Sequence, residues 1–497
     1  MFLFQFPLVR LFCAYISGII WAFYFPIEVH TIYLLIAIFC FLLYFLVYQN
    51  KIPGVVFYPI FFVFGILNLN HSIPAKILLG KHRCHCTVLK KKQQKSRLIY
   101  WMDCQTKNET VKCEVQWFDK ICMPELNEEI NIDLILSSIP PTKKTAAFDY
   151  TAYLKRNGIS TMAKVKNTKE ANYISINIPQ NLSSIWREKW VALFRHKLSE
   201  RASVLTPAIL FGDKTGLEKE TKALFSQAGI IHILAVSGLH VGMIYILVFR
   251  FLFWIGKRPR AEHIRNFISL LVLVFYAWIC GFSPSISRAV LMFAMLFSAR
   301  LFLKSIPTLH QLILSAFILL LYEPLWLFHL GFQFSYLATA GILVGLSSLN
   351  NFKIKSKLVK YIVESTAVSF SAQGAVIPIS LYYFKQIPIW FFLTNIPAFI
   401  CAFALLLFSI LFLLFSGSDL ISDLLVFPIE WSTDGIYFLI EAVNYIPIRM
   451  ITLPISSIIG LISCYFILYA SFLFFTKKAF SLVKWILIAF CILLLFP

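Results

Sequence analysis

The stretch AILFGDKTGLEKETKALFSQAGIIHILAVSGLHVGMIY, at residues 208–245, decides the fold class. Ser237 and Gly238 interrupt its apolar run, and His240 follows two residues later. A polar group at bilayer depth costs roughly 3 kcal/mol or more unless it faces other helices or a water-filled path. We therefore interpret the stretch as a broken membrane helix whose polar residues border a path. The alternative that the spacing leaves open is a structural kink with a satisfied histidine.

The composition excludes a soluble globular protein. Hydrophobic residues make up 59% of the 497 residues and charged residues only 14%, which is more apolar surface than one core can bury. Apolar runs at 8–25, 32–48 and 54–69 are read as transmembrane helices. The first run lacks the cleavage pattern of a signal peptide. About eight to ten further helices are expected after residue 230.

A polar stretch separates these runs from the larger apolar block. It contains short alternating segments, typical of strands, at 84–89, 97–103, 111–118, 129–136, 160–165 and 173–178. Such a set indicates a small barrel such as an OB-fold. The predicted fold class is a polytopic α-helical membrane protein with an inserted small β-barrel domain. The expected domains are N-terminal transmembrane helices at 1–70, an OB-like domain at 71–182, an amphipathic interfacial helix at 183–205 and a transmembrane channel domain at 206–497.

The segment at 184–205 has an apolar side and a basic side at helical spacing. Trp186, Trp190 and Phe194 recur at helical spacing, and the basic residues Arg187 and Arg195 lie between or next to them in the sequence. This pattern predicts one helix that lies along the headgroups with its tryptophans at the interface. A core helix packed under the barrel is the alternative.

Polar groups and helix breakers recur in the apolar block. GFSPSISR, at 281–288, places a proline and two serines ahead of Arg288, although such an arginine more often reaches the interface. LGFQFSYLATAG contains Gln333 and Ser335, SAQGAVIPIS contains Gln373, and LTNIPAF contains Asn395. Broken helices lined by such groups are tolerated at membrane depth only inside protein or beside a cavity. The recurrence therefore favours a path through the block.

Two spacing relations extend this pattern. His232 and His240 lie two turns apart and fall on roughly the same side of a helix. Gly238 and Gly242 form a pair of small residues four apart, which lets another helix approach closely.

Basic residues predict the orientation of the chain. They mark four segments as cytoplasmic, at Arg10, Lys51, 257–265 and 353–360. The third span then delivers the polar insert to the outer side. Between residues 71 and 200 there are 22 Lys or Arg against 12 Asp or Glu, a surplus of 10 positive charges within a net charge of +21. This surplus suits anionic headgroups or a polyanionic ligand.

Five cysteines share the insert, namely Cys84, Cys86, Cys104, Cys113 and Cys122. Disulfides are possible among them if the insert faces an oxidising compartment, and the odd number leaves at least one unpaired. His82 and His85 beside Cys84 and Cys86 have the side chains of a zinc site, but this spacing better suits a strand whose cysteines pair elsewhere. We predict no metal and no cofactor.

The chain resembles the ComEC family of competence proteins. LFGDKTGL with AGIIHILAVSGLHVG, GFSPSISRAVLM, HLGFQFSYLATAGIL and the region 373–397 are similar to that family's signature, and FDYTAYLKRNGIS, at 148–160, is similar to its OB-like extracytoplasmic domain. The resemblance covers most of the chain from about residue 20 to about residue 475.

The resemblance implies a bacterial inner-membrane channel that translocates single-stranded DNA into the cytoplasm during natural transformation. We assign ten residues to the translocation path: Asp213, His232, Ser237, Gly238, His240, Gly242, Arg288, Gln333, Gln373 and Asn395. Many relatives carry a carboxy-terminal metallo-β-lactamase-like domain, whereas this chain has no HxHxDH motif among its ten histidines. It is therefore not expected to be an enzyme. The other reading is a polytopic transporter of a small solute or a lipid-linked substrate.

The insert has the ingredients of a single-strand-binding surface, because basic grooves and aromatic stacking surfaces bind such strands. We assign seven residues to DNA binding: Lys90, Lys91, Lys92, Arg97, Tyr100, Trp101 and Trp117. The alternative for each aromatic residue is a place in the barrel core. The expected partners are single-stranded DNA, membrane lipid, a DNA-receptor protein outside, a cytoplasmic helicase or single-strand-binding protein, and a second copy of the chain.

Overall fold

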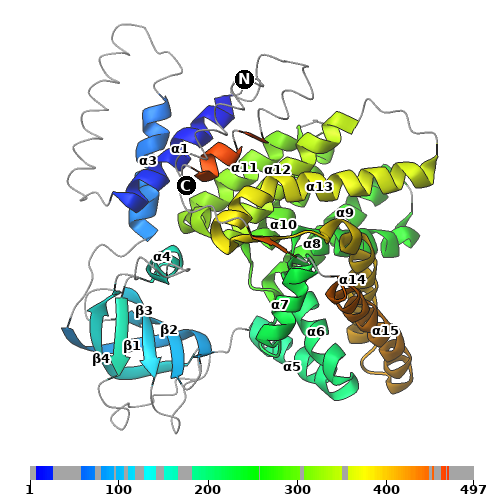
Figure 1. Ribbon diagram of the computed structural model, residues 1–497, viewed down its shortest axis with the longest axis horizontal. Coiled ribbons are helices and arrows are strands. Elements are labelled where there is room, and N and C mark those ends of the chain that lie inside the picture. The colour runs from blue at the N-terminus through cyan, green and yellow to red at the C-terminus, as the bar shows by residue number, and fades with distance from the viewer. Residues whose placement is uncertain are drawn as a thin grey trace, which may run out of the picture. The chain divides into compact units, whose positions relative to one another are not determined.

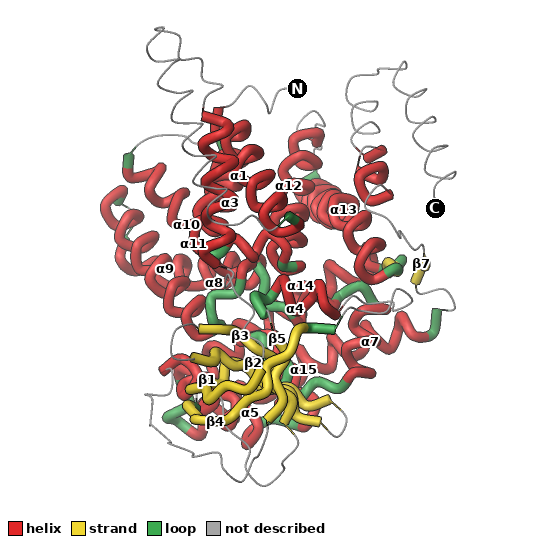
Figure 2. Tube along the Cα trace, turned by 90° about the vertical axis from the view of Figure 1, so that its left-hand side faces the viewer, coloured by secondary structure: helices red, strands yellow, loops and turns green. Residues whose placement is uncertain are grey.

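The structure is a computed structural model that describes most of the chain in two compact units. The described residues are 7–25, 57–72, 80–94, 97–105, 110–117, 128–140, 150–159, 161–165, 182–256, 258–302, 307–349, 356–446, 450–452, 460–465 and 467–468. Unit 1 comprises Met1–Ile185 with Ile313–Leu330, and unit 2 comprises Trp186–Leu312 with Gly331–Pro497. Helices dominate both views of the molecule, and the first five strands gather in one small domain (Figure 1, Figure 2).

Two amino-terminal helices of unit 1, α1 (Pro7–Tyr24) and α3 (Phe57–Ser72), cross at close range. Gly18 and Gly65 make the crossing possible, because a Cβ on either would collide with the backbone of the other helix. The hydroxyl of Tyr15 donates to the Leu320 carbonyl oxygen at 2.9 Å, which ties α1 to a segment some 300 residues away. The span expected at 32–48 lies outside the described residues.

The polar insert is a closed five-stranded barrel, as predicted. Its strands are β1 (Gly80–Gln94), β2 (Arg97–Gln105), β3 (Thr110–Trp117), β4 (Glu129–Ser138) and β5 (Thr161–Val165), with α4 (Tyr150–Arg156) before β5. They close in the order β1-β2-β3-β5-β4 (Figure 1). The pair β3 and β5 is parallel and the other pairs are antiparallel. The strand expected at 173–178 lies outside the described residues.

Alternation along β4 illustrates why these residues form a barrel. Ile130, Ile132, Leu134 and Leu136 are buried, whereas the residues between them are half-buried or exposed. A period of two places one set of side chains inside and the other outside.

After the barrel the chain forms a succession of helices and short 3-10 turns. The elements that follow the barrel along the chain are α5 (Leu182–Lys197), α6 (Glu200–Phe211), α7 (Lys219–Gln227), η4 (Ile231–Leu234), α8 (Gly238–Phe251), η5 (Leu252–Ile255), α9 (Pro259–Ile279), α10 (Pro284–Leu301), α11 (Thr308–Tyr322), η6 (Pro324–Phe328), α12 (Leu330–Leu349), α13 (Lys357–Phe384), β6 (Gln386–Pro388), α14 (Phe391–Leu414), α15 (Asp419–Asn444) and β7 (Met450–Thr452). Most of these elements belong to unit 2, whereas most of α11 and all of η6 belong to unit 1.

Six described helices are long and apolar enough to cross a membrane. They are Pro7–Tyr24, Gly238–Ile255, Pro259–Ile279, Pro284–Leu301, Val359–Phe384 and Phe391–Leu414. With the closed barrel, they confirm the predicted fold class, a multi-pass helical membrane protein with an inserted small barrel. The limits of the four domains expected from the sequence stay a prediction.

The single amphipathic helix predicted at 184–205 is wrong, because the chain forms α5 and α6 instead. Ser199 ends the continuity: it is the N-cap of α6, and its hydroxyl oxygen accepts from the Ala202 N–H at 3.4 Å. Phe194 of α5 stacks on Phe412 of α14 with ring centroids 5.3 Å apart. Nearly all of α6 is buried, so α6 is a core helix of unit 2.

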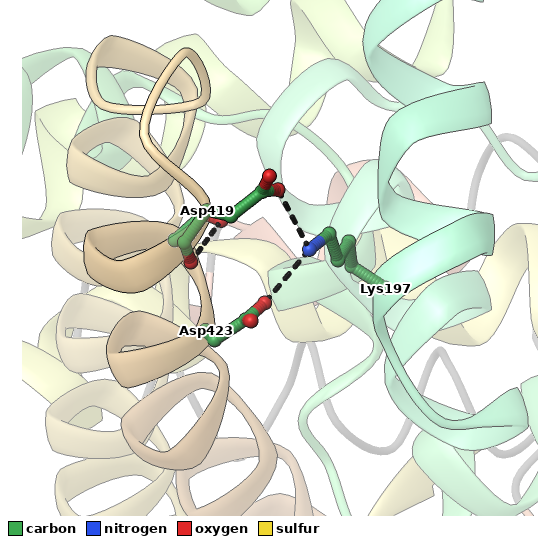
Figure 3. Close-up of polar contacts among 4 residues, drawn as sticks. Lys197, Asp419 and Asp423 are labelled. Atoms are coloured by element: carbon green, nitrogen blue, oxygen red, sulfur yellow. Dashed lines mark hydrogen bonds and ion pairs between the residues drawn. The ribbon is translucent and has the colours of Figure 1, made fainter.

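Charged groups bind α5 to the first turns of α15. Lys197 Nζ lies 3.2 Å from Asp419 Oδ1 and 2.8 Å from Asp423 Oδ1 (Figure 3). The hydrogen bonds that Lys197 donates to these two carboxylates raise the pKa of its ammonium group. Exposed ion pairs contribute little stability by themselves, so these contacts orient the end of α5 beside α15, while the stacking of Phe194 on Phe412 packs α5 against α14.

Replacing Gly65 with alanine should destabilise the α1–α3 pair by about 1–3 kcal/mol, because overpacking of a close contact has this cost. The added methyl group would meet the Tyr15 carbonyl oxygen. Thermal unfolding of the detergent-solubilised chain measures the loss. Gly374→Ala in α13 is the matched control, because its Cβ would have nothing within 4 Å. Equal losses in both variants would contradict the close crossing.

Replacing Asp103 with asparagine should stabilise the barrel at pH 7. Burial raises the pKa of the Asp103 carboxyl, although the nearby Lys112 ammonium lowers it. The folded state therefore binds a proton more tightly than the unfolded state, and stability falls as pH rises above the unfolded pKa of about 3.9. Calorimetry should show a higher melting temperature for Asp103→Asn at pH 7 and no difference near pH 3. The exposed Asp133→Asn is the control.

Candidate functional site

The break that the sequence predicts lies between α7 and α8. Gly229 follows α7 with a φ of +78°, a conformation that glycine adopts without strain. Its Cβ position is occupied, because a methyl group there would lie 3.0 Å from the Phe391 Cα atom. Thr394 Oγ1 donates to the Ala228 carbonyl oxygen at 2.7 Å. The start of α14 therefore holds the break in place.

Ser237 and His240 begin α8 as a capping box. The Leu239 N–H donates to Ser237 Oγ at 3.2 Å, and the Ser237 N–H donates to His240 Nδ1 at 3.2 Å. His240 is 2% exposed, and its Nε2 atom has no partner in the described chain. Hydrogen bonds between neighbouring residues thus form the kink. Of the two ring nitrogens of His240, only Nδ1 has a hydrogen-bond partner among the described residues.

Arg288, in the second turn of α10, lies against this helix start. Its side chain is 8% exposed, so it does not reach the interface. Nε donates to Ser335 Oγ of α12 at 2.7 Å, and Nη1 lies 3.4 Å from Met292 Sδ. A methyl group on Gly238 would lie 2.5 Å from Nη2. The structure thus brings together four predicted residues of the path, Ser237, Gly238, His240 and Arg288.

The other residues assigned to the path lie elsewhere. Asp213 is held in its own turn, where Oδ1 accepts from the Thr215 N–H at 3.0 Å and from its hydroxyl at 2.7 Å. His232 is an exposed residue of η4. Gly242 has nothing within 4 Å of its Cβ position, so the close helix approach predicted for the pair occurs only at Gly238.

The three amides of the predicted path are half-buried and sit on three helices. Gln333 belongs to α12, Gln373 to α13 and Asn395 to α14. Asn395 Oδ1 is buried with no partner in the described residues. Their role in a path stays a prediction.

The barrel corrects two of the residues assigned to DNA binding. Tyr100 is 0% exposed and Trp117 is 1% exposed, and both belong to the hydrophobic core of the barrel. A base cannot stack on a buried ring, so the core alternative holds for both. Trp101 is half-buried, with its Nε1 donating to Glu114 Oε2 at 3.1 Å. The side chains of Lys90, Lys91, Lys92 and Arg97 lie outside the described residues.

Three thiols meet inside the barrel. Cys104 Sγ lies 2.7 Å from Cys86 Sγ and 2.9 Å from Cys113 Sγ. These cysteines and the buried Cys84 are free thiols in this structure, and Cys122 lies outside the described residues. The disulfides stay a prediction.

The alternation of side chains along β1 argues against a zinc site at KHRCHC, because it puts neighbouring residues on opposite faces of the strand. Cys84 and Cys86 point into the barrel, whereas His85 binds Glu129 and Asn131 on the other face, at 3.0 and 2.8 Å. Within the described residues, no group of three or more His, Cys, Asp or Glu is placed to hold a metal ion.

Sequence reasoning missed several contacts of this region. Thr394 binds the break, and Tyr336 lies under the Arg288 guanidinium with 5.8 Å between the ring centroid and Cζ. A hydroxyl in an apolar span was the only signal for Thr394. Gly341 and Gly345 form a small-residue pair against Ser371 of α13, which their spacing could have revealed.

Replacing Ser237 with alanine should destabilise the chain by about 1 kcal/mol, because the variant loses the N-cap of α8. Thermal unfolding of the solubilised protein measures this loss. Ser298→Ala provides the control, since Ser298 is exposed in α10 and binds only the Ala294 carbonyl of its own helix. A Ser237→Asn variant, which keeps a capping oxygen, should retain most of the stability. A loss no larger than that of the control would contradict the capping role.

Sequence comparisons place this site inside a known family. Residues 209–478 match the competence protein family. The chain is similar to ComE operon protein 3 of Bacillus subtilis, with 30% identity over 49% of this chain and 30% of the relative. It is also similar to Recombination protein 2 of Haemophilus influenzae, with 23% identity over 60% of this chain and 38% of the relative.

The matched region spans less than two fifths of the length of these curated relatives. No solved structure matches the chain. The family match covers α8, α10, α12, α13 and α14, which carry the break and the polar residues described above. Because it extends over more than half of the sequence, this chain belongs to the competence protein family.

Proposed function

We propose that this chain is an inner-membrane channel that passes single-stranded DNA into the cytoplasm during natural transformation. The observation that carries the proposal is the start of α8 inside the competence region. There Ser237, His240 and Arg288 bring polar and charged groups into helices long enough to span a membrane. Such groups are costly in lipid and mark a path for a solute or ion by default.

The charge of the chain favours a polyanion as the transported species. The segment 71–200 carries a surplus of 10 positive charges, and it includes the barrel. On the orientation expected from the basic loops, the barrel lies outside the cell and attracts the incoming strand through its phosphates. Trp101 is the one assigned aromatic residue that the described barrel leaves partly accessible for stacking.

The partners that this function requires are proposals as well. A DNA-receptor protein outside would deliver the strand, and a helicase or single-strand-binding protein in the cytoplasm would draw it inward. A second copy of the chain and membrane lipid complete the expected surroundings. We assign no catalytic residue to this chain.

Reconstitution tests the channel. Vesicles that contain the full chain, with the vesicle interior held positive, should protect a labelled oligothymidylate from added nuclease, because the strand enters the lumen. Protein-free vesicles and a labelled double strand of equal length should give no protection. Protection that does not exceed the protein-free level would contradict the proposal. Entry of small labelled solutes without entry of the strand would instead support a solute transporter.

A further inference from the structure

Arg288 is a buried cation with no counter-charge among the residues that the structure describes. In the described part of the chain no Asp or Glu forms an ion pair with it. Its hydrogen bonds reach a neutral hydroxyl on Ser335 and a thioether on Met292, and Nη2 makes none within the described residues. Burying a charge is costly unless an opposite charge compensates it. The arrangement is therefore incomplete without an anion.

The beginning of α8 adds a second positive feature at the same point. Gly238 is the first residue of this 14-residue helix, and a methyl group on it would lie only 2.5 Å from Arg288 Nη2. The first turn of a helix presents N–H groups and about half a positive charge. A guanidinium placed there is repelled rather than stabilised, unless an anion lies between the two.

The same helix end carries one more unused donor. The Ser237 N–H can only donate, so His240 Nδ1 is the acceptor of their hydrogen bond. The proton of the neutral ring is then on Nε2, which is buried and has no partner in the described chain. Two donors thus remain at one end of α8, a guanidinium N–H and an imidazole N–H, beside first-turn main-chain amides that Ser237 caps.

These donors match a phosphate oxyanion. Helix starts bind phosphate through main-chain N–H groups, and arginine supplies a planar set of donors that suits phosphate geometry. We propose that Arg288 and the first turn of α8 form a site for one phosphodiester group of a single strand. The inference rests on the proposed function. Contacts to phosphate carry no base information, so the site is independent of sequence.

Gly238 has a specific part in this site. The absence of a side chain allows Arg288 to reach the helix start, and Ala289 follows it closely, with its Cβ 3.5 Å from the Gly238 Cβ position. Gly238→Ala keeps every charge of the protein but displaces the guanidinium. This variant therefore tests whether the position of the Arg288 guanidinium matters, whereas Arg288→Gln tests whether its charge matters.

Binding of a labelled oligothymidylate to the full chain, in a sugar detergent without phosphate, tests the site over a series of salt concentrations. Arg288→Gln should weaken binding and reduce the slope of log K against log salt by about 0.7, the value for one phosphate contact with a single strand. Arg288→Lys should keep the slope. Gly238→Ala should reduce affinity and slope in the same direction as Arg288→Gln. A methylphosphonate strand, which has no backbone charge, should bind wild type and Arg288→Gln equally.

Arg300→Gln is the matched control. Arg300 lies on the same helix, but it is exposed and sits 3.4 Å from the Glu262 carboxylate, so its loss should leave the slope unchanged. An unchanged slope for Arg288→Gln, or equal weakening for the methylphosphonate strand, would overturn the site. Equal competition by phosphatidylglycerol would assign it to a lipid headgroup and overturn it as a DNA site. In the vesicle assay, protection of the strand by the Arg288→Gln variant at the wild-type level would overturn this site alone. Lack of protection by the wild-type chain would instead overturn the channel.

Discussion

Every backbone N–H and C=O group at membrane depth needs a hydrogen-bond partner, and the arrangement of the membrane helices depends on this constraint. A helix that stops at membrane depth exposes N–H and C=O groups that water cannot reach. The competence region stops its helices repeatedly, and side chains supply partners at several of these stops. Tyr276 donates to the Leu210 carbonyl at the end of α6, at 2.7 Å, and Thr394 donates to the Ala228 carbonyl after α7. Ser237 then caps the start of α8, so specific hydrogen bonds hold the break between α7 and α8 in a defined structure.

The sequence predicted the elements whose signal is local. Period-two alternation located the five described strands, and the polar interruption at Ser237 located the start of α8. Contacts between distant segments were beyond reach, because spacing does not say which face of a strand or helix is covered. For Tyr100 and Trp117 the sequence offered both a binding groove and the barrel core, and the core was the commoner expectation for a single aromatic residue. Ser199 looked like one more polar residue of a helix until Glu430 supplied partners for its N–H and hydroxyl.

The division of the chain into units shows a second limit of sequence reading. Residues Ile313–Leu330 come from the apolar block but pack with the barrel and the first helices. A methyl group on Gly158 would lie 3.4 Å from Leu325 Cδ1, and burial raises the pKa of Glu323, although Lys112 of β3 lowers it. The η6 turn that follows α11 is therefore part of the packing of unit 1.

The described acidic residues of the block lie away from Arg288. Asp419, Asp423, Glu430 and Glu441 all lie on α15, where they bind Lys197, Ser199 and Arg201 of α5 and α6. A face of α15 next to these carboxylates exposes large apolar residues, which suits lipid. Glu262 and Glu364 pair with other basic residues at the ends of α10 and α13. The described carboxylates of the block thus serve packing and solubility at the periphery, whereas Arg288 stays buried without one. A protein that only needed a stable bundle would gain by placing an apolar residue there. Retention of a cation beside the positive end of α8 is instead the arrangement expected where anions pass.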